Sequence, residues 1–445
     1  MVLALTLAAP LPLPAQSASA ALAKGRLHRA VAVADRPDHT YALYLPTAYD
    51  RRQPRPLLLA FCAGGDGAGA VARHQRAAEA HGWIVAGSNV SRNGPPEPSQ
   101  DAARTLLADV RARFAVDEAR LYACGLSGGA CVANWLAQSA AVPFAGVFLH
   151  ARGDITQVPG GPARTFHLLA PGAADFNFDE SVRYLVAAEK VGATAVLDVQ
   201  PGGHEWASAA ACERFLRFAE IEHALAAAAV DERVARLLTA EFDDLVAQLD
   251  GALPWLAQRR LAALAARLPD KDKRCDRLRQ RWAELSKQLT ADAADERAAW
   301  DELATKCQFD AAIDGRYPSA ASVRAVDQAR RDLLARWTGT TAAELALLSR
   351  QNTPVSLARA LGGNLPPEAK DAYVAVATQC ADHGVPWLAR ARELIAANKL
   401  RRAIGALQHG VRAGAVQAQD LAAEPFAKLR NLPAFQALLA AARGR

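Results

Sequence analysis

The pattern of apolar and polar positions changes character near residue 221. Before it, short apolar or β-branched runs alternate with segments in which apolar residues recur every three or four positions, and these two patterns predict strands and amphipathic helices. The predicted strands are Leu27–Val33, Tyr41–Leu45, Pro56–Phe61, Trp83–Gly87, Arg120–Cys124, Gly146–His150, Thr165–Leu169 and Ala195–Val199. The predicted helices are Ala70–His81, Gln100–Phe114, Gly128–Ala137, Glu180–Lys190 and Ala207–Ala219.

The order of these elements predicts an α/β fold for residues 24–222. Two or three strands come first, and strands and helices then alternate strictly. That order implies a mostly parallel sheet, covered by helices on both faces and led by an antiparallel hairpin. Right-handed crossovers fix most of the remaining topology.

Beyond residue 222 the strand pattern disappears. Ala, Leu, Glu and Arg dominate, and Pro or Gly breaks divide the segment into helices of ordinary length. We therefore expect a second, all-α domain over residues 223–445. Residues 386–445 read as helix pairs, and the stretch Ala423–Leu439 resembles the tail that often closes tetratricopeptide arrays. No 34-residue period precedes that tail, so the pattern does not establish a repeat array.

Length and charge agree with this division. A chain of 445 residues exceeds what one compact core usually holds. Residues 24–222 carry 20 basic and 20 acidic side chains, so the whole excess of 32 basic over 26 acidic residues lies beyond residue 222. Those basic residues are mixed with acidic ones on predicted helices and are not clustered with aromatic residues, which argues against a nucleic-acid partner.

The N-terminal 23 residues have the pattern of an export signal. They carry no charge, and the apolar stretch Val2–Pro14 is followed by Ala18-Ser19-Ala20, an A-x-A cleavage pattern. We expect a periplasmic or secreted protein. Because no Lys or Arg precedes the apolar stretch, a cytoplasmic protein with an Ala/Pro-rich tail is the alternative. No stretch of ~20 uncharged apolar residues predicts a transmembrane span.

Seven cysteines are few for this length, and no C-x-x-C pair suggests a zinc site. Cys275 and Cys307 lie on two predicted amphipathic helices that would fold back near Thr290. Both cysteines would then lie at equal distances from the turn on facing apolar stripes. A Cys275–Cys307 disulfide is a hypothesis that fits export, and two buried thiols are the alternative.

The candidate chemistry begins at Gly125-Leu126-Ser127-Gly128-Gly129, between a predicted strand and a predicted helix. G-x-S-x-G in this position is typical of a nucleophile elbow, in which the glycines remove the Cβ atoms that would clash in the tight turn. The serine Oγ is then exposed above the sheet. A chance glycine-rich turn is the alternative for the five residues taken alone.

An acid and a histidine follow in the order that such an elbow requires. Asp175 comes after the strand Thr165–Leu169, and His204 comes after the strand Ala195–Val199. All three groups fall at carboxyl ends of strands, where open α/β sheets place their sites. In this arrangement Ser127 attacks an acyl carbonyl, His204 transfers its proton, and Asp175 orients the imidazole. Asp154 and Asp179 compete with Asp175 for the role of the acid.

These motifs resemble those of α/β-hydrolases similar to polyhydroxybutyrate depolymerases, feruloyl esterases and dienelactone hydrolases. The resemblance rests on the elbow, on the string Asp175-Phe176-Asn177-Phe178-Asp179-Glu180 and on Gly202-Gly203-His204-Glu205-Trp206. It covers under half of the chain. It implies ester hydrolysis through an acyl-enzyme, with no metal or organic cofactor, on a small-molecule or polymer-displayed ester.

One departure from that pattern concerns the oxyanion hole. Cys62 and Ala63 stand where such enzymes usually have His-Gly after the third strand. Because the donor is a backbone N–H, we assign the N–H groups of Gly64 and Gly128 to the hole. If Ala63 changed the conformation of the loop, the loss of one donor would cost roughly 3–4 kcal/mol of transition-state stabilisation.

Two classes of function follow from these observations. The first is a serine esterase with an open cleft, because only residues 151–163 separate two neighbouring strands and leave little room for a helical lid. The same triad would also serve acyl transfer or peptide hydrolysis. The second class is a helical interaction or scaffold protein that carries a degenerate hydrolase domain and binds a protein partner through its helical half.

Overall fold

The computed structural model describes most of the chain. The described residues are 22–152, 165–350 without 174, 176, 201, 250–253, 271, 290–292, 307–318, 338–339 and 344, and 400–444 without 413–415, with isolated positions between 372 and 398. Residues 1–21, which hold the predicted cleavage pattern, lie outside this part. Export therefore stays a prediction.

One eight-stranded sheet organises the first half of the chain. Its strands are β1 (Leu27–Ala32), β2 (Thr40–Tyr44), β3 (Arg55–Cys62), β4 (Ile84–Ser88), β5 (Val116–Leu126), β6 (Gly146–His150), β7 (Phe166–Ala170) and β8 (Ala195–Leu197). The strand order is β1-β2-β4-β3-β5-β6-β7-β8. β1 and β2 pair antiparallel, β2 pairs antiparallel with β4, and the remaining neighbours are parallel. The predicted mostly parallel, α/β-hydrolase-like sheet with a leading antiparallel hairpin is confirmed.

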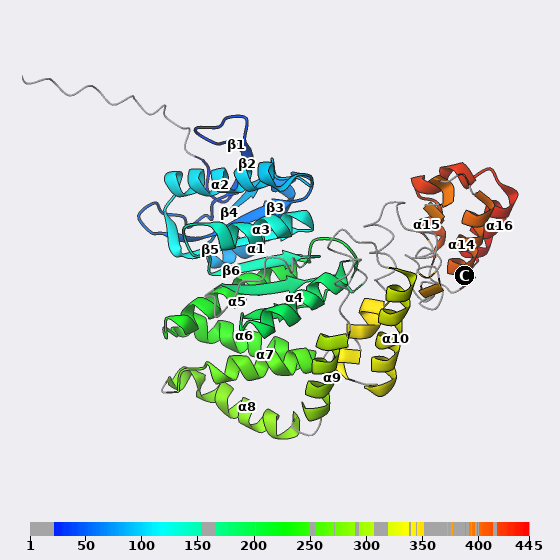
Figure 1. The fold of residues 1–445 in the computed structure, drawn as a ribbon. Helices are drawn as coiled ribbons and strands as arrows, with labels where there is room; N and C mark the ends of the chain where they lie inside the picture. The colour runs from blue at the N-terminus through cyan, green and yellow to red at the C-terminus, as the bar shows by residue number, and fades with distance from the viewer. Residues whose placement is uncertain are drawn as a thin grey trace, which may run out of the picture.

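Helices cover both faces of this sheet (Figure 1). α1 (Gly67–His81) and α5 (Ala209–Ala226) share one apolar core with the sheet. α2 (Pro96–Arg113), α3 (Gly128–Ser139) and α4 (Phe178–Lys190) share the core on the other face. Strands buried on both faces explain why the central segments read as nearly continuous apolar runs.

β5 and α2 both begin earlier than predicted. The added residues of β5 include the acids Asp117 and Glu118, and α2 begins at a proline. β5 begins at Val116 and not at Arg120, because its first residues are exposed or half-buried and carry no apolar signal. α2 begins at Pro96, four residues before the predicted start at Gln100. Proline suits the first turn of a helix, since the N–H that it lacks has no partner there in any case.

The second half of the described chain is helical, as predicted. Its α-helices are α6 (Glu232–Gln248), α7 (Pro254–Ala266), α8 (Asp276–Leu289), α9 (Ala293–Lys306), α10 (Ala320–Arg336), α14 (Leu400–Arg412), α15 (Ala418–Leu421) and α16 (Pro433–Arg443). No strand follows Leu197 in the described ranges. No helix among the described residues has the length and apolar content that a membrane crossing needs.

Three apolar clusters divide this helical half. α6, α7 and α8 pack in one cluster that includes the end of α5. Residues of α9, α10 and the segment 342–346 belong to the same core as the sheet and α2–α4. A separate cluster joins residues 391–442, including α14 and α16, and lies apart from the sheet in Figure 1. The predicted division at residue 222 stays a prediction, and part of the helical half shares the apolar core of the sheet half.

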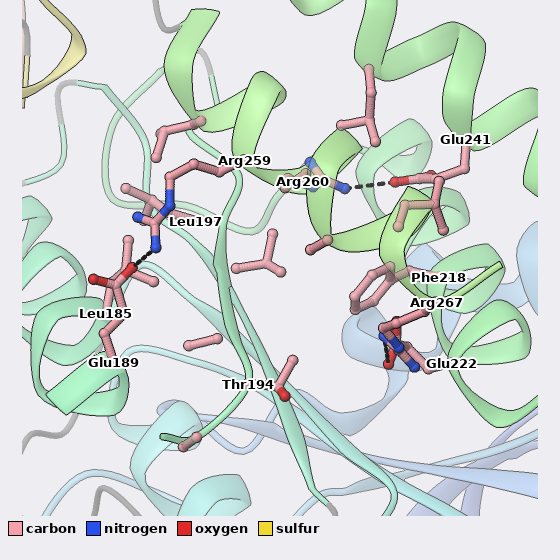
Figure 2. A pocket seen from close by; sticks show the side chains of 17 residues that line it. Leu185, Glu189, Thr194, Leu197, Phe218, Glu222, Glu241, Arg259, Arg260 and Arg267 are labelled. Carbon is pink, nitrogen blue, oxygen red and sulfur yellow. Dashed lines mark hydrogen bonds and ion pairs between the residues drawn. The ribbon is translucent and has the colours of Figure 1, made fainter. Parts of the chain in front are cut away.

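A cavity of about 210 Å³ lies where α4, β8 and α5 meet α6 and α7. Its lining is mainly apolar, with Leu185, Leu197 and Leu256 among the lining residues. Figure 2 shows the charged side chains around it: Arg259 points to Glu189, Arg260 to Glu241, and Arg267 lies beside Glu222. Each of these arginines is therefore neutralised within the protein.

Cys62, Cys124, Cys212 and Cys275 are free thiols. Cys62 and Cys124 are free, so the bridge between them that their neighbouring strands would allow is absent. Cys275 is a buried free thiol in the cluster of α6–α8. Its hypothesised partner, Cys307, lies outside the described residues, so the Cys275–Cys307 disulfide is not tested.

Candidate active site

Ser127 lies on a strained turn between β5 and α3. Its backbone angles are φ 57° and ψ −123°, and positive φ is uncommon for a residue other than glycine. The backbone N–H of Ser127 donates to His150 O at 3.1 Å, which ties the turn to the end of β6. Residues in such sparsely populated conformations cluster at functional sites, because the surrounding structure must hold the strain.

Two glycines permit this turn. A Cβ at Gly125 would lie 2.1 Å from Gly129 O, and a Cβ at Gly129 would lie 2.2 Å from Phe61 O. Both distances are far below van der Waals contact, so any larger residue would push the strand, the turn and the helix apart. The G-x-S-x-G pattern is therefore explained by packing at this turn.

Asp175 and His204 meet at the carboxyl ends of β7 and β8. His204 Nδ1 lies 2.9 Å from Asp175 Oδ1. Asp175 is fully buried and also accepts a hydrogen bond from the backbone N–H of Asn177 at 2.8 Å. Two loops that are 29 residues apart in the chain thus form one acid–histidine pair.

Ser127 lies at the end of β5, on the same edge of the sheet as this pair. No hydrogen bond joins Ser127 Oγ to His204 in the described part of the chain. Catalytic hydrogen bonds are often long without substrate and shorten only in the complex. The structure therefore brings Asp175 and His204 together, and the contact between Ser127 and His204 belongs to the proposal below.

The loop after β3 accommodates Ala63 without backbone strain. Ala63 is not among the described residues with positive φ; the left-handed conformation falls instead on Gly65, at φ 75°. The Ala63 Cβ would lie 3.8 Å from a Cβ built on Gly128, an ordinary van der Waals distance. Gly64 is exposed, and a Cβ built there would contact nothing within 4 Å. The departure at Ala63 is thus compatible with an open loop beside the nucleophile turn.

Asn93 braces this loop, although no sequence motif marks it as a functional residue. Its backbone N–H donates to Ala63 O at 2.8 Å, next to an isolated bridge between Gly64 and Arg92. A Cβ built on Gly128 would lie 1.9 Å from Asn93 Oδ1. The Asn93 side chain therefore stands directly against the backbone to which we assign one oxyanion donor. Asn93 lies in a loop with no motif, so its role depends on contacts that only the fold creates.

His150 connects the nucleophile turn with the histidine loop. Its carbonyl accepts from Ser127 N, and its Nδ1 accepts from the backbone N–H of Ala207 at 3.1 Å. Trp206 packs against the imidazole with ring centroids 4.7 Å apart. Burial lowers the pKa of His150 well below its usual value, so the ring is neutral and can accept that bond. His150 thus anchors the turn of Ser127 to the loop that carries His204.

One buried cluster has the composition of a metal site. Ligand atoms of His74, His150 and Cys212 lie within 4.8 Å of one another. However, a backbone N–H can only donate, so the bond from Ala207 leaves the proton of the neutral His150 ring on Nε2. His74 Nδ1 donates to Ala70 O and leaves its Nε2 as an acceptor. Nε2 of His74 and Nε2 of His150 are both buried without a hydrogen-bond partner among the described residues, and burial lowers the pKa of both rings, so both are neutral.

The other candidate acids are not paired with His204: Asp179 and Asp198 pair with arginines, and Asp154 lies outside the described residues. Asp179 is buried and paired with Arg330 of α10 at 2.7 Å, so it points away from His204 toward the helical half. Asp198 pairs with Arg214 at 2.9 Å, as expected for a structural acid. Asp154, with most of the segment in which we expect no lid, lies outside the described residues. The cavity in Figure 2 is lined by none of the three triad candidates.

Comparison with known proteins gives structural likeness at low identity. No protein-family model matches the chain, and no curated protein matches it. A ferulic acid esterase shares 16% identity over 41% of this chain and 91% of its own, with a TM-score of 0.36. Esterase LipW from Mycobacterium marinum shares 19% over 46% and 82%, with a TM-score of 0.35. Esterase B from Lactobacillus rhamnosis shares 17% over 44% and 86%, with a TM-score of 0.37.

Proposed function

We propose that this protein is a serine hydrolase that cleaves carboxylic esters through an acyl-enzyme intermediate. The observation that carries the proposal is the buried Asp175–His204 pair at the sheet edge where Ser127 sits on its strained turn. A histidine oriented by a buried carboxylate, beside a serine on an elbow, is the arrangement that activates a hydroxyl nucleophile.

In the proposed reaction Ser127 Oγ attacks the acyl carbonyl while His204 Nε2 accepts the hydroxyl proton. Asp175 holds Nδ1 and stabilises the imidazolium that forms. The N–H groups of Gly64 and Gly128 stabilise the oxyanion. The imidazolium then protonates the leaving alcohol. Water attacks the acyl-enzyme, gives its proton to His204, and the carboxylic acid leaves as Ser127 regains its proton.

The exposed loop at Gly64 supports soluble or polymer-displayed esters as the substrate class. The unstrained backbone at Ala63 favours an active enzyme over a degenerate domain, because the loop keeps its donor-bearing backbone beside the nucleophile turn. Both of the proposed oxyanion donors are backbone groups, so neither depends on the side chains that differ from the usual His-Gly pattern.

The test is turnover of p-nitrophenyl acetate and butyrate by wild type and by Ser127→Ala. We expect the wild type to hydrolyse both esters and the variant to lose at least about 10³-fold in kcat. Ser91→Ala is the matched control, since Ser91 is a buried serine outside the triad, and it should retain activity. A wild type without turnover, or a Ser127→Ala variant as active as wild type, would contradict the proposal and favour a non-catalytic interaction protein.

A further inference from the structure

The loop that carries Asp175 and the start of α4 form one hydrogen-bonded unit. Asn177 N donates to Asp175 Oδ1 at 2.8 Å, and Phe178 N donates to Asp175 O at 3.0 Å. α4 starts at Phe178, which places Asp179 in its first turn, four residues after Asp175. Any displacement of that first turn would therefore move the carboxylate that faces His204.

Residues from the helical half fix this first turn. Arg330 Nη2 of α10 donates to Asp179 Oδ1 at 2.7 Å, and the Ser349 hydroxyl donates to the same oxygen. Arg330 Nη1 also approaches the carbonyl of Ser349 at 3.4 Å. Arg330 is 1% exposed and Asp179 is 8% exposed. These contacts span 151 and 170 residues of sequence.

Burial of Arg330 and Asp179 limits the positions that the first turn of α4 can take. A buried carboxylate or guanidinium that loses its partner keeps the full cost of desolvation, so each of these two groups confines the other to the paired geometry. Apolar packing acts in the same direction, because Leu333 and Leu345 belong to the same core as Phe178 at the start of α4. The position of the first turn thus depends on α10 and the segment after it.

Two other ion pairs near the acid loop do not connect it to the helical half. Arg183 lies 3.6 Å from Asp179 but belongs to α4 itself, so it moves with the turn. Arg152 and Glu180 pair at 3.4 Å within the sheet half. In the described ranges, Arg330 and Ser349 are the polar contacts from the helical half to Asp179.

We propose that Arg330 is a positioning residue for the hydrolysis reaction. Through Asp179 it holds the loop that presents Asp175 to His204, and the helical half therefore contributes to the active site from within the same chain. This inference rests on the proposed function, because it assigns Asp175 the role of the triad acid.

The experiment compares Arg330→Met with Arg260→Met. Arg260 is a matched control: its side chain is 11% exposed, it lies on α7 in the same helical half, and it pairs with the buried Glu241 of α6 at 2.7 Å. Turnover of p-nitrophenyl butyrate is expressed per serine that a fluorophosphonate titrates to completion, which removes the effect of unfolded protein. A 1 Å misplacement of a catalytic group costs about 100-fold, so we expect kcat to fall about 10- to 100-fold in Arg330→Met with little change in KM.

Arg260→Met should keep a kcat close to wild type, and Arg330→Lys should recover part of the loss because it restores a positive charge at Asp179. If Arg330→Met does not fold, Ser349→Ala removes the second donor to Asp179 with a smaller change in volume. It should lower kcat per titrated serine several-fold.

The outcomes separate this inference from the proposed function. A kcat equal to that of Arg260→Met in both Arg330→Met and Ser349→Ala would overturn the positioning role while the wild type remains an esterase. A change confined to KM, with kcat unchanged, would also overturn the positioning role. A wild type that neither turns over ester nor reacts with the fluorophosphonate would overturn the proposed function first, and this inference with it.

Discussion

The two halves of this molecule use buried charge in different ways. In the sheet half, a single buried acid meets a histidine at the strand ends, where strands that are far apart in sequence come together. In the helical half, buried acids such as Glu241 and Asp327 each accept ion pairs from two arginines and join helices to one another. The first arrangement presents a reactive group, and the second fixes positions. Asp179 is where the two arrangements meet.

The strongest test of this comparison replaces one buried acid from each half of the molecule by its amide. Asp175→Asn should lower kcat about 10³- to 10⁴-fold, because an amide favours the wrong histidine tautomer and cannot stabilise the imidazolium. Glu241→Gln alters a buried acid of the helical half that is paired with Arg217 and Arg260, and it should change kcat only slightly. Ester turnover and thermal melting of both variants measure the difference. Equal losses in the two variants would remove the distinction.

A second prediction concerns acid sensitivity. Burial lowers the pKa of His74 to about 4 and that of His167 to about 4, and both lie in the sheet half. Between pH 6.5 and 4 the unfolded chain binds these protons and the folded chain does not, so stability is fully present above pH 6.5 and is lost as pH falls toward 4. The loss is on the order of 3 kcal/mol for each histidine.

His74→Leu tests this prediction against the wild type. Urea unfolding at a series of pH values should show that acidification lowers the free energy of unfolding less in His74→Leu than in the wild type. The difference should be about 3 kcal/mol. The control is Arg76→Leu, an exposed neighbour on the same helix that does not contribute to the lowered pKa of His74, and it should keep the wild-type slope. A His74→Leu slope equal to that of the wild type would mean that this ring is already protonated in the folded state.

The smallest expected effect on activity comes from the C-terminal cluster. Phe426 is fully buried in the cluster of residues 391–442, and Phe426→Ala should cost that cluster about 3–5 kcal/mol. Ester turnover should remain at the wild-type level, since the cluster shares no core residue with the sheet. Hydrogen exchange should show the loss confined to α14–α16. A matched fall in turnover would tie this cluster to the active site.

Sequence patterns were sufficient where the signal is local. β6 begins and ends where the apolar run Gly146–His150 predicts, because a buried strand is read from consecutive residues. The elbow at Ser127 was also local, since its glycines are required by contacts within one turn and one neighbouring strand. The sheet order followed from the alternation of strands and helices and from the handedness of crossovers.

Contacts between distant segments could not be predicted in this way. Asp179 was one of three candidate acids, and only its pairing with Arg330, 151 residues later, shows that it faces the helical half. Asn93 and His150 likewise carry no motif, and their contacts depend on loops that the fold brings together. Single-sequence patterns record which faces are apolar, but they do not record which polar group each buried charge meets.

The most direct measurement of the central claim is the site of covalent labelling by a fluorophosphonate. The labelled protein is digested and the modified peptide is identified by mass spectrometry, with Ser127→Ala treated in parallel. We expect one adduct per chain, located on Ser127, and none in the variant. An unlabelled wild type, or an adduct on a different serine that persists in Ser127→Ala, would contradict it.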